Sequence, residues 1–386
     1  MGDKWPIVSI AHDYLTQRGG AERVVLAMHR AFPEATIYTT LYDPDGTYPE
    51  FRDATIVTSP LNRVPVFRRN HRAALPLLAP AANALKVPGD VVVTSSSGWA
   101  HGFRVAGRKL VYCHSPARWL YLSRQYLGGE RTRSLMALAL AGLKPALVPW
   151  DRRAASRADR YVANSTVVHE RIGEVYGFDA AMFHPPHSVD VTGQLEPIPG
   201  FEQFVGEGGH FLVVSRLLPY KNVVQAVEAF RGLEERLLVI GEGPLRAALE
   251  ERLPENVRLA SRLTDAQLRW AYSTSKALLA PSHEDFGITP LEAGAWGRPT
   301  IALRAGGYLD TIVEGVTGEF IERPSAAAMR EAILAFDPAD WEPRHIREHV
   351  ERFSEERFRT WLRAEVAYLA HSSRATSRAR ALSSRT

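Results

Sequence analysis

The sequence predicts an α/β protein with two doubly wound domains, each a parallel sheet covered by helices. Its 386 residues suffice for about two domains of roughly 150 residues, each with its own core. Short β-branched runs alternate with amphipathic stretches, which is the pattern of α/β architecture. A segment near the middle of the chain carries neither pattern. These three observations indicate two α/β domains joined by a linker.

The predicted strands are short apolar runs bounded by turn-forming residues. In the first half they cover residues 7–11, 36–39, 91–95, 109–113 and 160–163. In the second half they cover residues 211–215, 237–241, 256–259, 277–280 and 299–303. Amphipathic helices fit between the strands, for example over 21–32 and 223–230.

Residues 184–210 indicate the linker, because they are rich in Pro and Gly and lack periodicity. The Ser- and Arg-rich end of the chain is expected to be disordered. The predicted segments are an N-terminal domain 1–190, a linker 191–209, a C-terminal domain 210–352, a closing helix 353–371 and a tail 372–386. Two doubly wound domains facing across a cleft would place a ligand at the carboxyl ends of both sheets.

Composition and patterning exclude several classes of protein. No run approaches the ~18 apolar residues of a membrane span, and the start lacks a signal peptide's apolar stretch, so we expect a cytoplasmic protein. The single cysteine, Cys113, excludes an internal disulfide and a multi-cysteine metal site. The net charge of +4 conceals a basic first half, an acidic second half and a basic tail, so we expect no nucleic acid partner.

Two glutamates in "HEDFGITPLEAGAWGRP" (283–299) are candidate site residues. Glu284 follows a predicted strand, at the sheet edge where α/β proteins bind ligands, although a solvated loop acid is the simpler interpretation. Glu292 lies in a predicted helix start. There it fits a capping box in which Thr289 is the N-cap and Pro290 occupies the first helical position.

The same helix start is suited to a phosphate, because its N–H groups are unpaired and its dipole end is positive. The step Phe286-Gly287-Ile288 would let the backbone approach such a group closely. Carboxylates beside a phosphate would be repelled by it, so useful ones should bind hydroxyl groups instead. Sugar and ribose hydroxyls are the natural partners.

A second candidate set follows the strand 211–215 in "VVSRLLPYKN". Arg216 and Lys221 could clamp a diphosphate, although two solvated bases at a helix entry are the simpler interpretation. Gly241 and Gly243 in "IGEGPLR" would suit a backbone touching a nucleotide. The third glycine of a dinucleotide fingerprint is missing there, so that signal is weak alone.

In the first half, "QRGGAERVV" joins a strand to a helix through Gly19-Gly20, which would suit a phosphate or a sugar as well as a plain tight turn. His114 stands at a strand end in "YCHSPARWLY". Adjacent strand residues point to opposite faces, so Cys113 and His114 form no nucleophile–base pair, and Cys113 is expected in the core. Asp43-Pro44-Asp45 is the one Asp-x-Asp candidate for a metal, and its Pro and Gly indicate a turn.

Taken together, the motifs resemble those of a retaining glycosyltransferase of family 4 with the GT-B fold. They occur in that family's order and span roughly residues 7–335. One departure is Ser261, which stands where the family usually has glycine in its base-contacting loop. The matching pieces are "RGGAERVV", "CHSPARWLY", "WDRRAASRADRYVANSTVVHERI", "VSRLLPYKN", "IGEGP" and "PSHEDFGITPLEAGAWGRPTIALRAGGYLDTIVEGVTGEF".

The resemblance implies roles for individual residues. Arg216 and Lys221 would hold the donor diphosphate, Glu284 would contact the donor sugar, and Glu292 the nucleotide ribose. His114 would lie by the reacting sugar and Arg118 on the acceptor side. The remaining donor-binding positions would be Gly19, Gly20, Gly241, Gly243, Phe286, Gly287 and Ile288. It also implies that the C-terminal helix packs back on the N-terminal domain.

The implied reaction moves a hexose from a nucleoside diphosphate sugar to a hydroxyl acceptor with retention of configuration and without a metal or other cofactor. The mannosyltransferase-like branch, acting in polysaccharide, O-antigen or glycolipid assembly, is the nearest in character, and GDP-mannose is the expected donor. A glycosyltransferase of soluble acceptors, a GT-B nucleotide-sugar epimerase and a binding module without turnover are the alternatives. The intact set Arg216, Lys221, Glu284 and Glu292 argues against the last.

Residues 60–85 interleave arginines with apolar side chains. Such a segment can lie on an anionic membrane surface, where a lipid-linked acceptor would be reached from the inner face of the cell membrane. A surface helix that covers the first sheet explains the same pattern equally well.

Overall fold

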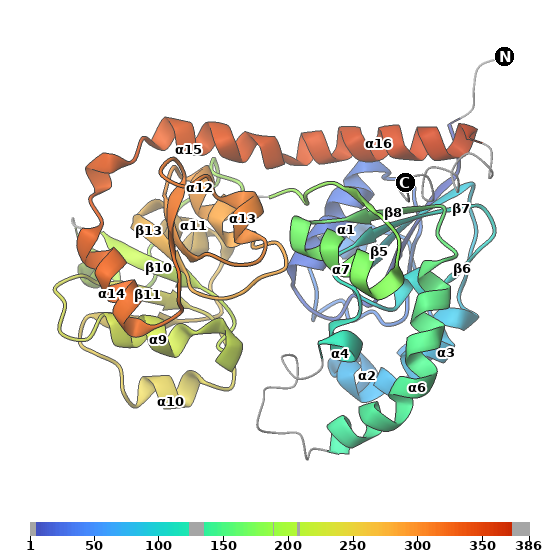
Figure 1. Ribbon diagram of the computed structural model, residues 1–386, viewed down its shortest axis with the longest axis horizontal. Helices are drawn as coiled ribbons and strands as arrows, with labels where there is room; N and C mark the ends of the chain where they lie inside the picture. Colours follow the sequence, from blue (N-terminus) through green and yellow to red (C-terminus); the bar gives the residue numbers. More distant parts are fainter. Residues whose placement is uncertain (1–4, 123–134, 188, 207–208, 373–386) are drawn as a thin grey trace. The chain divides into compact units, whose positions relative to one another are not determined.

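The computed structural model describes residues 5–122, 135–187, 189–206 and 209–372 (Figure 1). The predicted tail 372–386 lies outside this part of the chain, apart from its first residue. The chain divides into two compact units. The N-terminal unit comprises Met1–Pro186 with Glu355–Thr386, and the C-terminal unit comprises His187–Ser354.

The N-terminal unit is built on a parallel sheet in which, within the described residues, the strand order is β3-β2-β1-β5-β7-β8-β9. These strands are β1 (Val8–His12), β2 (Ile37–Thr39), β3 (Ile56–Thr58), β5 (Val91–Ser96), β7 (Arg108–Cys113), β8 (Arg160–Ala163) and β9 (Ala181–Met182). A separate small pair joins β4 (Lys86–Val87) to β6 (Arg104–Val105). The strand order reverses between β1 and β5, which is the switch point where open α/β sheets bind ligands.

Helices cover both faces of this sheet (Figure 1). Val91 and Val93 pack toward α1 and α16, whereas Val92, between them, packs on the other face with Ala82 of α3. The α-helices of the unit are α1 (Gly20–Ala31), α2 (Pro65–Arg69), α3 (Leu75–Ala84), α4 (Arg118–Tyr121), α6 (Leu135–Ala155), α7 (Thr166–Tyr176) and α16 (Glu355–His371).

The closing helix α16 belongs to the N-terminal unit, which confirms that prediction. Phe358, Leu362 and Val366 are fully or almost fully buried in the same core as β1 and α1. Phe358 also meets the ring of Tyr112 edge-on, with centroids 5.5 Å apart. A segment distant in sequence therefore completes the core of the first unit.

The C-terminal unit repeats the architecture with the order β12-β11-β10-β13-β14-β15. Its strands are β10 (His210–Val214), β11 (Leu237–Ile240), β12 (Val257–Ala260), β13 (Ser275–Ala280), β14 (Thr300–Leu303) and β15 (Gly318–Ile321). Its α-helices are α8 (Glu202–Val205), α9 (Val223–Ala229), α10 (Arg246–Glu250), α11 (Asp265–Ser273), α12 (Thr289–Ala295), α13 (Tyr308–Thr311), α14 (Ala326–Ala335) and α15 (Pro343–Val350). The switch point here lies between β10 and β13.

The predicted α/β class with two parallel sheets is confirmed, and each predicted strand is present within two residues of its expected bounds. The short edge strands β3, β9 and β15 are not predicted, because three or four residues with charged or polar neighbours carry little periodicity. Within the described residues, no helix combines the length and apolarity that crossing a bilayer requires.

His210 makes the stability of the C-terminal unit sensitive to acid. It is fully buried, and burial lowers its pKa from 6.5 to about 4, with Arg298 and Lys276 adding to the effect. Below pH 6.5 the unfolded chain binds a proton that the folded chain does not, so stability falls as the pH drops toward 4. The full loss is about 3 kcal/mol.

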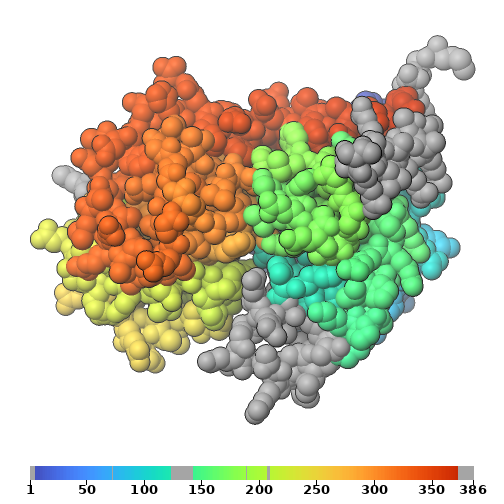
Figure 2. Space-filling view, in the orientation of Figure 1, coloured from blue at the N-terminus to red at the C-terminus, as the bar shows by residue number. Residues whose placement is uncertain are grey.

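We expect His210→Leu to reduce this loss, measured as the change in the urea midpoint of full-length protein between pH 7 and pH 5. The control is His345→Leu in α15, a helix at the surface of the C-terminal unit (Figure 2), where the side chain is exposed. The control should keep the parent's acid sensitivity. Equal sensitivity in the parent and His210→Leu would contradict the assignment.

Candidate functional site

In each unit a cluster of polar side chains lies at the switch point of the sheet. In the C-terminal unit the cluster follows β10 and β13, and in the N-terminal unit it follows β1, β5 and β7. Parallel strands bring loops that are distant in sequence to one edge, so these clusters require the sheet order and not only the sequence.

Lys221 and Glu284 form the centre of the C-terminal cluster. Lys221 ends the turn after β10, Glu284 lies in the loop after β13, and their charged groups form an ion pair in which both side chains are largely buried. Ser282 donates a second hydrogen bond, of 2.6 Å, to the same Oε1 atom of Glu284. Two donors therefore fix the orientation of this carboxylate, which a solvated loop acid would not require.

Tyr308 supports the cluster from α13. Its hydroxyl lies 3.2 Å from the Ser282 hydroxyl. Burial raises its pKa well above 10, and the negative charge of Glu284 contributes to the shift. Tyr308 thus remains a neutral hydroxyl that steadies Ser282.

Arg216 is exposed, unlike Lys221, and donates to the Tyr220 hydroxyl at 3.3 Å. The Lys221 ammonium lies 5.0 Å from the centre of the same Tyr220 ring. Both predicted cations therefore flank Tyr220, but Lys221 is engaged by Glu284.

Glycines hold the Glu284 loop close to the segment after β14. The Gly307 N–H donates to the Glu284 carbonyl at 2.9 Å. A Cβ at Gly306 would lie 2.2 Å from that carbonyl oxygen, and one at Gly287 would lie 2.4 Å from the Tyr308 ring. Gly287 and Gly306 also have positive φ angles, of 79° and 67°. The Gly306-Gly307 pair is missed as a site element, although two adjacent glycines shortly after a strand could have indicated it.

The predicted capping box is wrong. Helix α12 begins at Thr289, its N-cap is Ile288, and no side chain caps it. Ile288 already has helical angles, so the helix starts one residue earlier than predicted and Thr289 cannot serve as the cap. The Glu292 carboxylate instead accepts a 2.7 Å hydrogen bond from the Tyr272 hydroxyl.

Some predicted donor-site residues have a packing role in the structure. The Phe286 side chain is buried against Leu291, Val350 and Phe353, so only its backbone could face a ligand. A Cβ at Gly241 would lie 1.9 Å from the Ser215 carbonyl oxygen, and one at Gly243 would lie 2.4 Å from that of Leu217. These two glycines let the loop after β11 pack against the segment after β10.

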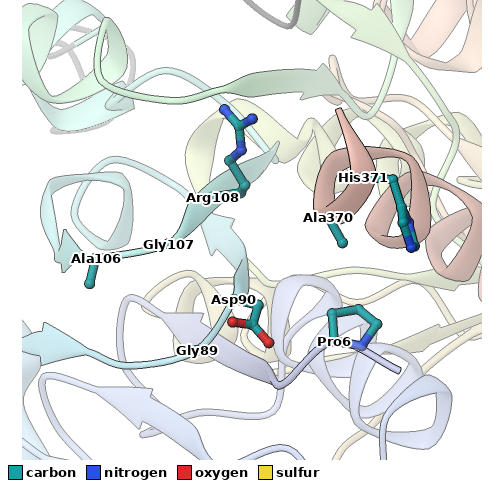
Figure 3. Close-up of a pocket in the computed structure, with 8 residues that line it drawn as sticks. All are labelled: Pro6, Gly89, Asp90, Ala106, Gly107, Arg108, Ala370 and His371. Carbon is teal, nitrogen blue, oxygen red and sulfur yellow. The ribbon is translucent and has the colours of Figure 1, made fainter. Parts of the chain in front are cut away.

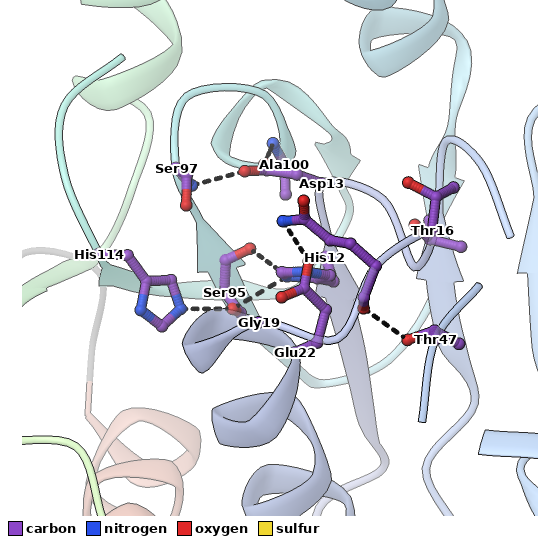
Figure 4. Close-up of polar contacts among 12 residues, drawn as sticks. His12, Asp13, Thr16, Gly19, Glu22, Thr47, Ser95, Ser97, Ala100 and His114 are labelled. Carbon is purple, nitrogen blue, oxygen red and sulfur yellow. Dashed lines mark hydrogen bonds and ion pairs between the residues drawn. The ribbon is translucent and has the colours of Figure 1, made fainter. Parts of the chain in front are cut away.

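The N-terminal cluster brings together His12, Ser95 and His114 from three strand ends (Figure 4). The Ser95 Oγ lies 3.0 Å from His12 Nδ1 and 2.8 Å from His114 Nε2. The Glu22 carboxylate of α1 lies 3.8 Å from His12 Nε2. His114 is a predicted site residue, whereas His12, Ser95 and Glu22 are missed.

Asp13 fixes the loop that follows β5 (Figure 4). Its buried carboxylate accepts hydrogen bonds from the backbone N–H groups of Ser97, Trp99 and Ala100, at 2.6, 3.1 and 2.5 Å. The sequence signal for this cluster is the pair His12-Asp13 directly after an apolar strand.

Gly19 is the N-cap of α1, and a Cβ there would lie 2.5 Å from Glu22 Oε2. A Cβ at Gly20 would meet nothing within 4 Å. The buried Glu22 side chain, which accepts from the Gln17 amide at 3.0 Å, therefore explains why residue 19 is glycine. A contact of Gly19 and Gly20 with the donor stays a prediction.

The other predicted positions in the N-terminal unit are placed as follows. Cys113 is buried in the core, as expected, and Arg118 is half-buried at the first position of α4. Asp43 accepts from the Asp45 backbone N–H at 3.3 Å, and Asp45 pairs with Arg52. These contacts are those of a turn.

A hollow of about 560 Å³ lies at the opposite, amino end of β5 and β7 (Figure 3). The two charged side chains in its lining, Asp90 and Arg108, are engaged: Asp90 accepts from the Ile7 N–H at 2.8 Å, and Arg108 pairs with Asp159. The hollow is therefore separate from both clusters and offers little charge to a ligand.

Two family models of glycosyltransferases match this chain. Residues 18–191 match the family model described as Glycosyltransferase Family 4. Residues 198–348 match the one described as Glycosyl transferases group 1. The two matches together account for most of the chain.

Curated relatives include several mannosyltransferases. Human alpha-1,3/1,6-mannosyltransferase ALG2 is 28% identical, and the match covers 82% of this chain and 84% of the relative. The GDP-mannose-dependent alpha-(1-6)-phosphatidylinositol monomannoside mannosyltransferase of Mycolicibacterium smegmatis is 28% identical, covering 48% of this chain and 56% of the relative. A GDP-mannose-dependent alpha-mannosyltransferase of Corynebacterium glutamicum is 33% identical, covering 38% of this chain and 34% of the relative.

Solved structures share the fold. Sucrose-phosphate synthase from Thermosynechococcus elongatus has a TM-score of 0.70 at 18% identity, covering 95% of this chain and all of that one. Anabaena HepE in complex with UDP-glucose has a TM-score of 0.65 at 15% identity, covering 94% of this chain and 99% of that one.

A pair of glycine substitutions separates loop packing from backbone conformation. Gly306 and Gly232 both have positive φ angles, but a Cβ at Gly232 meets nothing within 4 Å. We expect Gly232→Ala to lower the free energy of unfolding by about 1–2 kcal/mol, the cost of a left-handed conformation. Gly306→Ala should lower it further, because the Glu284 loop must move. Equal losses, measured by urea unfolding, would contradict this role of Gly306.

Proposed function

Because the chain belongs to glycosyltransferase family 4 and is a GT-B glycosyltransferase that uses a nucleotide-sugar donor, we propose that it is a retaining, metal-independent hexosyltransferase. The proposed sugar is mannose, from GDP-mannose. The proposed acceptor is a hydroxyl group of a lipid-linked or polysaccharide-type molecule.

The observation that carries the proposal is the oriented Glu284 carboxylate beside Lys221 at the switch point of the C-terminal sheet. A carboxylate held by an ammonium and a hydroxyl keeps acceptor capacity for a sugar hydroxyl. The ammonium has three donors, so Lys221 can hold Glu284 and still reach a phosphate oxygen. The pair thus provides for a sugar hydroxyl and a leaving phosphate in one place.

In the proposed reaction the bond between the anomeric carbon and the phosphate oxygen breaks, and the sugar becomes oxocarbenium-like. Negative charge grows on the departing diphosphate, where Arg216 and Lys221 would stabilise it by ~3–4 kcal/mol for each well-placed donor. Glu284 would orient the sugar, and the proposed role of His114 is the one that the family resemblance implies, a contact with the reacting sugar. The acceptor hydroxyl oxygen forms its bond to the anomeric carbon on the face from which the diphosphate departs, and the leaving phosphate takes the acceptor proton. No carboxylate then acts as a nucleophile, in contrast to retaining glycosidases.

Mannose is proposed because a relative that covers 82% of this chain is named a mannosyltransferase, and two further relatives are named as GDP-mannose-dependent. Relatives named glycogen synthase and D-rhamnosyltransferase match 33% and 39% of this chain, less than the 82% of ALG2. Glu292 is proposed to bind the ribose, with its carboxylate oriented by the Tyr272 hydroxyl.

A donor panel tests the proposal. GDP-mannose should raise the unfolding temperature more than UDP-sugars do, and it should be hydrolysed slowly without an acceptor, also in the presence of EDTA. Glu284→Gln should lower kcat by about tenfold to a hundredfold, since a hydrogen bond to a charged group contributes about 1.5–3 kcal/mol. Glu228→Gln removes an exposed, ion-paired glutamate of α9 and should leave kcat unchanged.

Several outcomes would overturn parts of the proposal. Full kcat in Glu284→Gln would exclude the sugar contact, and loss of turnover with EDTA would require a metal. Preference for a UDP-sugar would exclude mannose from GDP-mannose. Isomerisation of the donor without transfer would favour an epimerase, and transfer only to soluble acceptors would favour a small-molecule enzyme. Binding of no nucleotide sugar would contradict donor use.

The proposed route to a lipid-linked acceptor is a membrane-facing surface on residues 60–85. This segment forms short helical pieces, including α2 and α3, and α3 packs Ala82 on the first sheet, as the alternative interpretation expects. Leu75 and Leu78 are buried, whereas Val66 and Leu77 are 58% and 43% exposed. Arg63 and Arg69 are exposed nearby in sequence, and Arg68 is half-buried. Apolar and basic groups together favour an anionic bilayer surface.

We expect the protein to float with vesicles of phosphatidylserine and phosphatidylcholine at low salt. Val66→Asp combined with Leu77→Asp should reduce flotation strongly, because both changes place negative charge on the proposed surface. Leu334→Asp changes a leucine of α14 in the C-terminal unit that is 65% exposed, and should float like the parent. No flotation of the parent at low salt would exclude the membrane surface.

A further inference from the structure

A buried polar chain lies behind His114 in the N-terminal unit. It runs from Glu22 of α1 through His12 and Ser95 to His114, with the contacts drawn in Figure 4. Glu22, His12 and Ser95 are almost fully buried, whereas His114 is half-buried. His12 and Ser95 are register partners in the neighbouring strands β1 and β5, so the sheet itself sets their separation.

The hydrogen bonds decide where the protons lie. His12 Nδ1 is 3.2 Å from the Ser95 carbonyl oxygen, which can only accept, so Nδ1 must carry a proton. That N–H also points to the Ser95 Oγ at 3.0 Å and donates to it. Ser95 has one hydroxyl proton, and this proton is then available to His114.

The donor in the contact between Ser95 and His114 follows from the donor in the contact between His12 and Ser95. With His12 donating to Ser95, the Ser95 hydroxyl donates to His114 Nε2 at 2.8 Å. Nε2 must therefore be the unprotonated nitrogen of a neutral imidazole, and the ring proton lies on Nδ1. A proton on Nε2 would instead make the Ser95 oxygen accept from both rings, and the Ser95 hydroxyl would then not donate to His114.

The charged groups that face His12 keep it a donor. They are Glu22, from α1, and Asp13, from the loop after β1, while His114 is the titratable group at the other end. Burial alone lowers the pKa of His12, but the Glu22 carboxylate and the charge of Asp13 raise it above its ordinary value. The pair formed by buried Glu22 and His12 thus directs the hydrogen bonds toward His114.

We propose that Glu22, His12 and Ser95 are positioning residues that fix His114 as the neutral tautomer with its proton on Nδ1. His114 then meets the substrate as a hydrogen-bond donor with a fixed ring orientation. This inference rests on the proposed function for its effect on turnover, whereas the tautomer itself is a property of the protein without substrate.

The direct test is the nitrogen–hydrogen correlation spectrum of full-length protein labelled with ¹⁵N-histidine, without any ligand. The signals of His114 are assigned as those that disappear in His114→Gln. We expect an unprotonated Nε2 and a protonated Nδ1 at pH 7.5. In Ser95→Ala the pattern should change to a mixture of tautomers, because the hydroxyl that selects one of them is gone.

Turnover provides the second readout. We expect Ser95→Ala to lower kcat by about tenfold or more with a smaller change in donor KM, as is typical when a group that orients a functional histidine is removed. Ser95→Thr keeps the hydroxyl and should restore kcat. His12→Asn keeps a donor near the position of Nδ1 and should retain more activity than His12→Leu. Ser9→Ala, at a buried serine nearer the start of β1, is the control and should match the parent.

The two readouts separate this inference from the proposed function. Protonation of His114 on Nε2, or a tautomer unchanged by Ser95→Ala, would overturn the inference whether or not the protein transfers sugar. Equal kcat in His12→Leu, Ser95→Ala and the parent would overturn the positioning role. The predicted tautomer in a protein that binds no nucleotide sugar would contradict the function while the hydrogen-bond assignment stands.

Discussion

The carboxylate of Asp13 is buried at the end of β1, and it accepts three backbone N–H groups from the loop after β5. A buried carboxylate without donors would destabilise the fold by several kcal/mol. The loop is therefore held where its N–H groups reach Asp13. Ser95 lies two residues before Ser97, the first of these donors, and its hydroxyl contacts His12 and His114. The position of the loop after β5 thus depends on satisfying one buried charge, whereas the register of β1 and β5 sets the separation of His12 and Ser95.

The C-terminal cluster depends on the same constraint with a different solution. Glu284 obtains its donors from the side chains of Lys221 and Ser282, so two loops must approach each other closely. The Glu284 loop also packs against the segment after β14, and this contact requires glycine at residue 306, because a Cβ would collide with the Glu284 carbonyl oxygen. The glycines of this region are therefore explained first by the packing around the carboxylate, and any contact with a ligand comes in addition to it.

The sequence predicts the central strands well because most of them are buried apolar runs, and it selects Glu284, Lys221 and His114 because they follow such runs. It cannot predict which side chains pair, since Lys221 and Glu284 are 63 residues apart and meet only through the order β10–β13. His12 and Ser95 are separated by 83 residues and meet through the order β1–β5. The capping box of Thr289 fails for a local reason, since a start one residue earlier turns the expected cap into a helical residue.

The buried pair of Lys221 and Glu284 also bears on function through its energetics. Removing two charges from water is expensive, and replacing a buried ion pair by apolar residues is often neutral or stabilising. The pair is therefore poorly explained as a device for stability. In the proposed function the two charges serve a ligand that needs both an acceptor and a cation. A nucleotide sugar has hydroxyl groups and a diphosphate, and it meets both needs at once.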